Sequence, residues 1–396
     1  MKNFLFKLTA LGFTSFLLLA CLEVVLRITD PLHKIAVSKT FHETNFWTSD
    51  SILNHKLQPN LQASYSFLDE YTTTFRTNEH GYRTPLVEEN APFDETIVFL
   101  GDSFLESIQC QDDELISHYT KTFLDQWDAN RFRCVNLGVA SYSGAYYYLQ
   151  LKSEFEQYQP KTVVVGYFIG NDILGDNKVI DLLEYQDDDL ARIRLKKDQL
   201  QEDDALPPRY SQLAVQAYWE HYRGYLRPLA LKILGEDLIR KAGFHPEDWE
   251  MNQVQYFVDD LDNEAKAYVD NSVQWFVKMQ EFCEQKQIEL IVLLIPPGNQ
   301  LEKNMLTDGY HGGLTTFGRI ETEQPQKYIV EQFRKHGIEH IDLKGVYNQH
   351  LDKKLYFPVD SHWAPEGQEV AADTLSKRII SRYKAKSLSL EIEPSL

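Results

Sequence analysis

The sequence has few cysteines, a deficit of basic residues and, after its first thirty residues, no apolar run like that of the N-terminal segment. Its four cysteines show no zinc-site spacing, and the odd number that follows Cys21 defines no disulfide framework. Lys and Arg total 40 against 59 Asp and Glu, so the formal net charge is −19. Nucleic-acid binding through phosphates needs a basic surplus. The composition therefore argues against a zinc site and against a nucleic-acid partner.

The three later cysteines carry little information about function. Cys134 and Cys283 lie in apolar surroundings, which is typical of small core residues. A bridge between Cys110 and Cys134 is an alternative in an oxidising compartment. With 396 residues, of which 43% are hydrophobic, the chain has enough apolar side chains for a large core.

The N-terminal segment indicates export from the cytoplasm. Lys2 and Lys7 precede an uncharged stretch over residues 8–22, and Arg27 follows it. The stretch is short for a membrane span, so a cleaved signal peptide, a lipoprotein cleavage box ending at Cys21 and an uncleaved anchor are all open. We favour an anchor over residues 1–30, because the sequence continues apolar. Its positive charges would leave the body of the chain in the bacterial periplasm or at the cell surface.

Five short apolar runs predict buried strands of one parallel sheet. Two helical patterns, over residues 113–127 and 144–158, separate the first three runs. Strands that alternate with helices are typical of an α/β layer fold with right-handed connections. The predicted strands cover residues 96–101, 134–138, 162–168, 290–296 and 340–343.

The remaining segments suggest four parts along the chain. These are the anchor or signal segment 1–30, a preface 31–95 that packs on the catalytic domain, the α/β domain 96–384, and a polar tail 385–396. Within the domain, residues 174–286 are too long for one crossover and are predicted to be a helical insertion with an acidic stretch of low order. We expect this insertion to shape the substrate groove. No pattern indicates an oligomeric state.

Polar residues follow these strands and suggest an acyl-transfer site. In a parallel sheet, ligands bind outside the carboxyl ends of the strands. Ser103 follows the first strand, and His362 lies in the loop after the last strand with Asp360 two residues before it. A serine hydroxyl needs such a base, and the base needs an orienting carboxylate. The N–H groups of Ser103 and Gly138 and the amide of Asn171 are the candidate oxyanion donors.

Each of these residues also has a simpler interpretation. Gly101 and Gly138 are compatible with ordinary strand-end turns, and Asn171 and Asp360 are compatible with helix caps. Four such coincidences at one edge of the sheet are far less probable than one site. Two neighbours are candidate substrate contacts: Asp102, and Trp363, which either stacks on a sugar ring or packs the start of a helix. Asp102 and Glu106 would also suit a glycosidase, but sequence does not give their separation.

The blocks "GDS" at 101–103, "NLG" at 136–138 and "GND" at 170–172, followed by Asp360 and His362, resemble those of the GDSL/SGNH hydrolase superfamily. The resemblance implies a three-layer flavodoxin-like α/β fold, a Ser-His-Asp relay and no metal or other cofactor. The phrases "TNEHGYR", "LLIPPGNQ" and "YFPVDSHWAPEGQ" look like the membrane-anchored, extracytoplasmic bacterial branch.

Two departures from the superfamily pattern bear on function. The superfamily often has Asp three residues before His, where this chain has Val359, and the two-residue spacing is similar to that of alginate O-acetyltransferase-type members. No glycine follows closely after Ser103. Three functions stay open: an esterase that removes acyl groups from an extracytoplasmic glycan or lipid, an O-acyltransferase that acetylates a polysaccharide, and a non-catalytic binding protein. The intact residue set favours the esterase.

Overall fold

The structure is a computed structural model, and it describes most of the α/β part of the chain. By internal packing the chain divides into two units, residues 1–40 with 200–251 and residues 41–199 with 252–396. All features below belong to the second unit unless stated. The described residues are 7, 14–15, 17–25, 46–67, 70–83, 93–187, 189–194, 257–305, 322–358 and 360–392.

A five-stranded parallel sheet forms the centre of this unit, as predicted. The strands lie in the order β11-β10-β7-β5-β6, and every neighbouring pair is parallel. The first strand of this sheet along the chain, β5, therefore lies between the second and the third, which is the flavodoxin-like order. The strand order reverses between β5 and β7, because β6 is added on one side of β5 and β7 on the other, and ligands bind at such a switch point. The strands are β5 Glu95–Gly101, β6 Phe132–Asn136, β7 Thr162–Phe168, β10 Glu289–Ile295 and β11 His340–Asp342.

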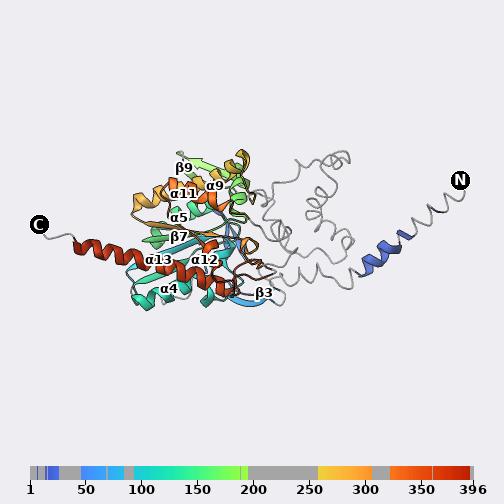
Figure 1. Cartoon of the computed structure of the whole chain (residues 1–396), viewed down its shortest axis with the longest axis horizontal. Coiled ribbons are helices and arrows are strands. Elements are labelled where there is room, and N and C mark those ends of the chain that lie inside the picture. The colour runs from blue at the N-terminus through green and yellow to red at the C-terminus, as the bar shows by residue number, and fades with distance from the viewer. Residues whose placement is uncertain are drawn as a thin grey trace. The chain divides into compact units, whose positions relative to one another are not determined.

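Helices cover both faces of the sheet, which confirms the predicted three-layer α/β fold. Figure 1 shows α4, α12 and α13 on one face and α5, α9 and α11 on the other. The two predicted crossover helices are present with nearly the predicted bounds. The helices are α4 Ile116–Trp127, α5 Gly144–Tyr158, α9 Asn263–Lys286, α11 Gln326–Lys335, α12 Leu343–Tyr347 and α13 Pro365–Ile392.

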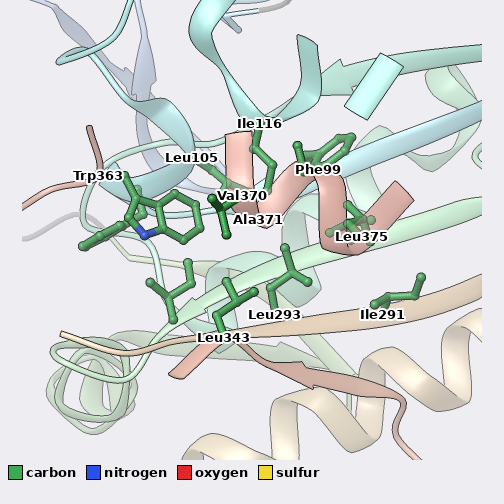
Figure 2. Close-up of a cluster of buried hydrophobic side chains, with 14 of the residues drawn as sticks. Phe99, Leu105, Ile116, Ile291, Leu293, Leu343, Trp363, Val370, Ala371 and Leu375 are labelled. Carbon is green, nitrogen blue, oxygen red and sulfur yellow. The ribbon is translucent and has the colours of Figure 1, made fainter. Parts of the chain in front are cut away.

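The main hydrophobic core lies between the sheet and α13. Figure 2 shows Val370, Ala371 and Leu375 of this helix facing Phe99 and Leu293 of the strands. The strands read as continuous apolar runs because both of their faces are buried. The four cysteines are free. The three cysteines in this unit are all buried, so the core interpretation is correct and the possible disulfide is not formed: Cys110, Cys134 and Cys283.

Two antiparallel hairpins precede the sheet and pack against the α/β domain. Their own buried cluster includes Phe46, Phe67 and Phe75, and Ile108 of the α/β domain packs against that cluster. The tight turn at Gly81 has φ 83°, a backbone conformation that glycine adopts without strain. The strands are β1 Trp47–Asp50, β2 Asn54–Leu57, β3 Gln62–Phe67 and β4 Tyr71–Arg76.

The insertion differs from its prediction where it is described. Part of the acidic stretch forms an antiparallel hairpin of β8 Leu183–Gln186 and β9 Asp189–Ile193. The side chains of Leu190 and Ile193 are buried, and their burial stabilises this hairpin. The helical part is represented by α9 at its end. Residues 195–256, where most of the predicted insertion falls, lie outside the described residues.

The predicted anchor also falls largely outside the description. Residues 17–25 are helical. Among the residues that the structure covers, no helix combines the length and apolar character needed to cross a membrane.

Candidate active site

Ser103 lies at the start of a short helix directly after β5. The helix, α3, spans Ser103–Glu106, and Asp102 caps it by accepting the N–H of Phe104 at 2.9 Å. The first N–H groups of a helix have no intrahelical acceptor. The N–H of Ser103 is one of these groups, and it makes no hydrogen bond to the described residues. The strand end thus presents a serine hydroxyl next to an available backbone donor.

The loop before α13 brings a histidine and an aspartate to this serine. The Nε2 of His362 lies 2.8 Å from the Oγ of Ser103, and its Nδ1 lies 2.6 Å from Oδ1 of Asp360. Between them, Ser361 has φ 70°, in the left-handed region. Two backbone hydrogen bonds close this turn: the Ser361 N–H donates to the Phe357 carbonyl, and the Phe357 N–H donates to the His362 carbonyl. The structure therefore joins the three predicted residues in one hydrogen-bonded chain.

The surroundings of His362 favour its protonated form. Burial by itself would lower its pKa, but the charge and hydrogen bond of Asp360, with a smaller contribution from Asp102, raise the pKa above the ordinary 6.5. A charged carboxylate fixes the Nδ1–H tautomer and leaves Nε2 facing the serine. The imidazole can accept the serine proton, and the resulting imidazolium is stabilised.

Asn171 reaches the serine through Asp102. It precedes α6 (Asp172–Lys178) at the end of β7, and its side-chain amide hydrogen-bonds the carboxylate of Asp102. A carboxylate only accepts, so the contacting atom is Nδ2, which carries a second N–H. The carbonyl Oδ1 of Asn171 is buried and has no partner within the described part of the chain. The contact with Asp102 therefore sets the orientation of the Asn171 side chain, and the carbonyl oxygen does not contribute to it.

Gly138 differs from its predicted role. Its N–H donates to Oδ1 of Asn136 at 2.9 Å, so it is not a free donor for an oxyanion. Its lack of a side chain matters for another reason. A Cβ at this position would lie 2.5 Å from the N of Glu106 and 2.6 Å from the carbonyl carbon of Leu105. Gly138 thus allows the loop after β6 to touch the backbone of α3.

The two predicted substrate contacts are wrong, because neither side chain reaches the solvent. Trp363 is 0% exposed and packs against the rings of Phe104 and Tyr347, which is the packing alternative. Asp102 is also 0% exposed, and burial raises its pKa to about 6 despite hydrogen bonds from Phe104 and Asn171. This carboxylate orients other groups of the site. Its burial likewise rules out the glycosidase interpretation.

The structure adds two residues that sequence reasoning missed. The hydroxyl of Tyr71 donates to Oδ2 of Asp360 at 2.7 Å, and the carboxylate of Glu70 accepts the Asp360 N–H at 2.7 Å. Both residues come from the β3–β4 hairpin, 289 and 290 residues away in the chain. No local pattern in "YTTTFR" distinguishes this tyrosine from a surface strand residue.

Comparisons with known proteins agree with this picture. A family model described as "SGNH hydrolase-like domain, acetyltransferase AlgX" matches residues 256–391, about a third of the chain. The matched range contains Asp360 and His362, whereas Ser103 and Asn171 precede it. No curated protein matches. The family match confirms the resemblance to the GDSL/SGNH superfamily and to its AlgX-type members.

Solved structures with some similarity are lipolytic and esterase proteins. One is described as a putative lipolytic protein of the G-D-S-L family from Desulfitobacterium hafniense, with 12% identity, TM-score 0.32, and coverage of 72% of this chain and 98% of that one. Another is an acetyl xylan esterase, AlAXEase, with 9% identity, TM-score 0.37, and coverage of 72% and 99%. A GDSL-like lipase from Bacteroides thetaiotaomicron has 11% identity, TM-score 0.33, and coverage of 75% and 92%.

Proposed function

Since the chain is SGNH hydrolase-like and related to the AlgX acetyltransferases, we propose that it is a serine-dependent acyl-ester enzyme in which Ser103 is the nucleophile. The observation that carries this proposal is the hydrogen-bonded chain from Ser103 through His362 to Asp360, with distances of 2.8 and 2.6 Å. These are the distances at which a base can take the serine proton.

The reaction follows from the positions of these groups. His362 removes the hydroxyl proton of Ser103 as the oxygen attacks the ester carbonyl, and Asp360 stabilises the imidazolium. The N–H of Ser103 and Nδ2 of Asn171 stabilise the oxyanion of the tetrahedral intermediate. His362 then returns the proton to the leaving alcohol, and an acyl group remains on the serine. One oxyanion donor typically contributes about 3 kcal/mol to transition-state stabilisation.

The acceptor of the acyl group distinguishes two functions. The leading proposal is hydrolysis, with water as acceptor and an O-acylated glycan or lipid as substrate. The second is transfer of an acetyl group to a polysaccharide hydroxyl, which the AlgX description of residues 256–391 favours. In both cases we place the domain outside the cytoplasm, held at the membrane by residues 1–30, because Lys2 and Lys7 precede the apolar stretch.

A chromogenic acetyl ester tests the shared chemistry and the acceptor together. The protein should release a burst of the chromophore, and a fluorophosphonate probe should label Ser103, while Ser103→Ala should lose both signals. Acceleration of turnover by an added oligosaccharide, with acetylated sugar as product, would identify a transferase. Unchanged labelling of Ser103→Ala would refute the assignment of the nucleophile. An intact, folded protein with neither burst nor labelling would favour the binding-protein alternative.

A further inference from the structure

Both carboxylate oxygens of Asp360 have hydrogen-bond partners, and the histidine is the partner of one of them. Oδ1 contacts Nδ1 of His362, and Oδ2 accepts the hydroxyl of Tyr71 at 2.7 Å. Asp360 is 6% exposed, so water does not take the place of these partners. The hydrogen-bonded chain from Ser103 therefore continues by one further residue, which comes from the β3–β4 hairpin.

The hairpin holds this tyrosine firmly. The centroid of its ring lies 4.7 Å from that of Phe357, three residues before Asp360, and 5.9 Å from that of Phe67. The neighbouring Glu70 accepts the backbone N–H of Asp360. One hairpin thus contacts both the side chain and the backbone of the aspartate.

Tyr71 can only act as a donor here. Burial, the charge of Asp360 and the proximity of Tyr65 raise its pKa far above 10, so its hydroxyl keeps its proton. A donated hydrogen bond stabilises the carboxylate and draws negative charge toward Oδ2. Less charge is then available at Oδ1 to hold a proton on His362.

We propose that Tyr71 is a positioning residue of the acyl-transfer site: it orients the carboxylate of Asp360 and limits its pull on the His362 proton. The inference rests on the function proposed above. The hairpin contacts add to the restraints that the turn and the histidine already place on the aspartate.

The titratable groups around the pair come from three places in the fold. Asp102, at the junction of β5 and α3, faces His362. The buried thiol of Cys110 lies within electrostatic reach of Asp360. The hairpin provides the rest: Tyr65, Glu70 and Tyr71. Of these groups, Tyr71 has the hydroxyl that donates a hydrogen bond to the Asp360 carboxylate, so its removal should have the clearest effect on the histidine.

Tyr71→Phe keeps the ring and removes the donor. We expect kcat for an acetyl ester to fall roughly tenfold, because a hydrogen bond to a charged group is lost, with little change in KM. The acidic limb of kcat/KM should move to higher pH, since Asp360 then holds the imidazolium more strongly. A purely structural role would lower the amount of active protein without moving that limb.

Tyr82→Phe is the matched control. Tyr82 is buried in the same N-terminal segment, and its hydroxyl also donates to a carboxylate, Glu154, at 2.7 Å, away from the serine. This variant should keep the kcat and the pH limb of the parent protein. If the two variants behave alike while the parent reacts with the fluorophosphonate probe, the inference fails and the proposed function stands. If the parent itself neither reacts nor turns over, the proposed function fails first.

A second variant covers the case in which Tyr71→Phe does not fold. Incorporation of 3-fluorotyrosine at position 71 keeps the ring and hydroxyl but makes the phenol a stronger donor. The acidic limb should then move to lower pH, opposite to the phenylalanine variant. A limb that stays in place, or moves in the same direction, would overturn the inference.

Discussion

Replacing Asp102 by Asn should make the protein more stable and less active. The carboxylate of Asp102 is 0% exposed, accepts the N–H of Phe104 and is hydrogen-bonded by the amide of Asn171. It carries a charge at neutral pH in a place where burial opposes that charge. Asp102→Asn has nearly the same shape and has no charge to bury.

The gain in stability follows from the pKa. A rise from 3.8 to about 6 for Asp102 corresponds to about 3 kcal/mol. Because the pKa is higher in the folded state, the folded protein binds the proton more tightly. The contribution is fully present below pH 3.8 and is lost as the pH rises through about 6. Asp102→Asn does not lose this stability as the pH rises. The difference in free energy of unfolding between variant and parent should therefore grow from near zero in acid to about 3 kcal/mol at pH 8.

The loss in activity follows from Asn171. In the parent protein, Nδ2 of Asn171 points to an acceptor, the carboxylate of Asp102, and Oδ1 of Asn171 has no partner within the described residues. In Asp102→Asn, the new amide group offers donors where the carboxylate accepted. Rotation of the Asn171 amide would satisfy both side chains but turn Nδ2 away from the oxyanion. The loss of one such donor lowers kcat by about 10²- to 10³-fold.

Urea unfolding at several pH values tests the predicted gain in stability, and the kinetics of acetyl ester turnover test the predicted loss in activity. Asp176→Asn is the control, because Asp176 is also buried with a pKa raised to about 6, yet it contacts Ala145 and Ser272 instead of the site. It should reproduce the pH-dependent stabilisation and keep kcat. Equal stability of Asp102→Asn and parent at pH 8, or an unchanged kcat, would refute the reasoning.

Two further substitutions test the local backbone. Gly138→Ala should lower both stability and kcat, because its Cβ would meet the α3 backbone at 2.5 Å and displace Ser103; a variant with parental melting temperature and kcat would contradict this contact. Ser361→Val should destabilise the protein, since φ is 70° there and a β-branched residue tolerates this region less well than serine, whereas Ser361→Gly should relieve about 1–2 kcal/mol of Cβ strain. Melting curves decide the latter, and equal melting temperatures for the Val and Gly variants would count against the strained turn.

Much of the fold was predictable because its determinants are local. Runs such as 162–168 are apolar on both faces, which a strand covered by helices requires, and these strands end within two residues of their predicted bounds. In a parallel sheet the carboxyl ends of the strands share one edge, so Ser103, Asn171 and His362 could be placed together from their order alone.

The tertiary structure decided which atoms are available at that edge. The N–H of Gly138 is taken by Asn136, and Asp102 and Trp363 are buried, although their positions beside Ser103 and His362 suggested contact with a substrate. Sequence adjacency gives closeness along the chain but not burial or hydrogen-bond partners. The contact between Tyr71 and Asp360 spans 289 residues, and no pattern of either segment specifies it, because it arises only when the hairpin packs on the loop before α13.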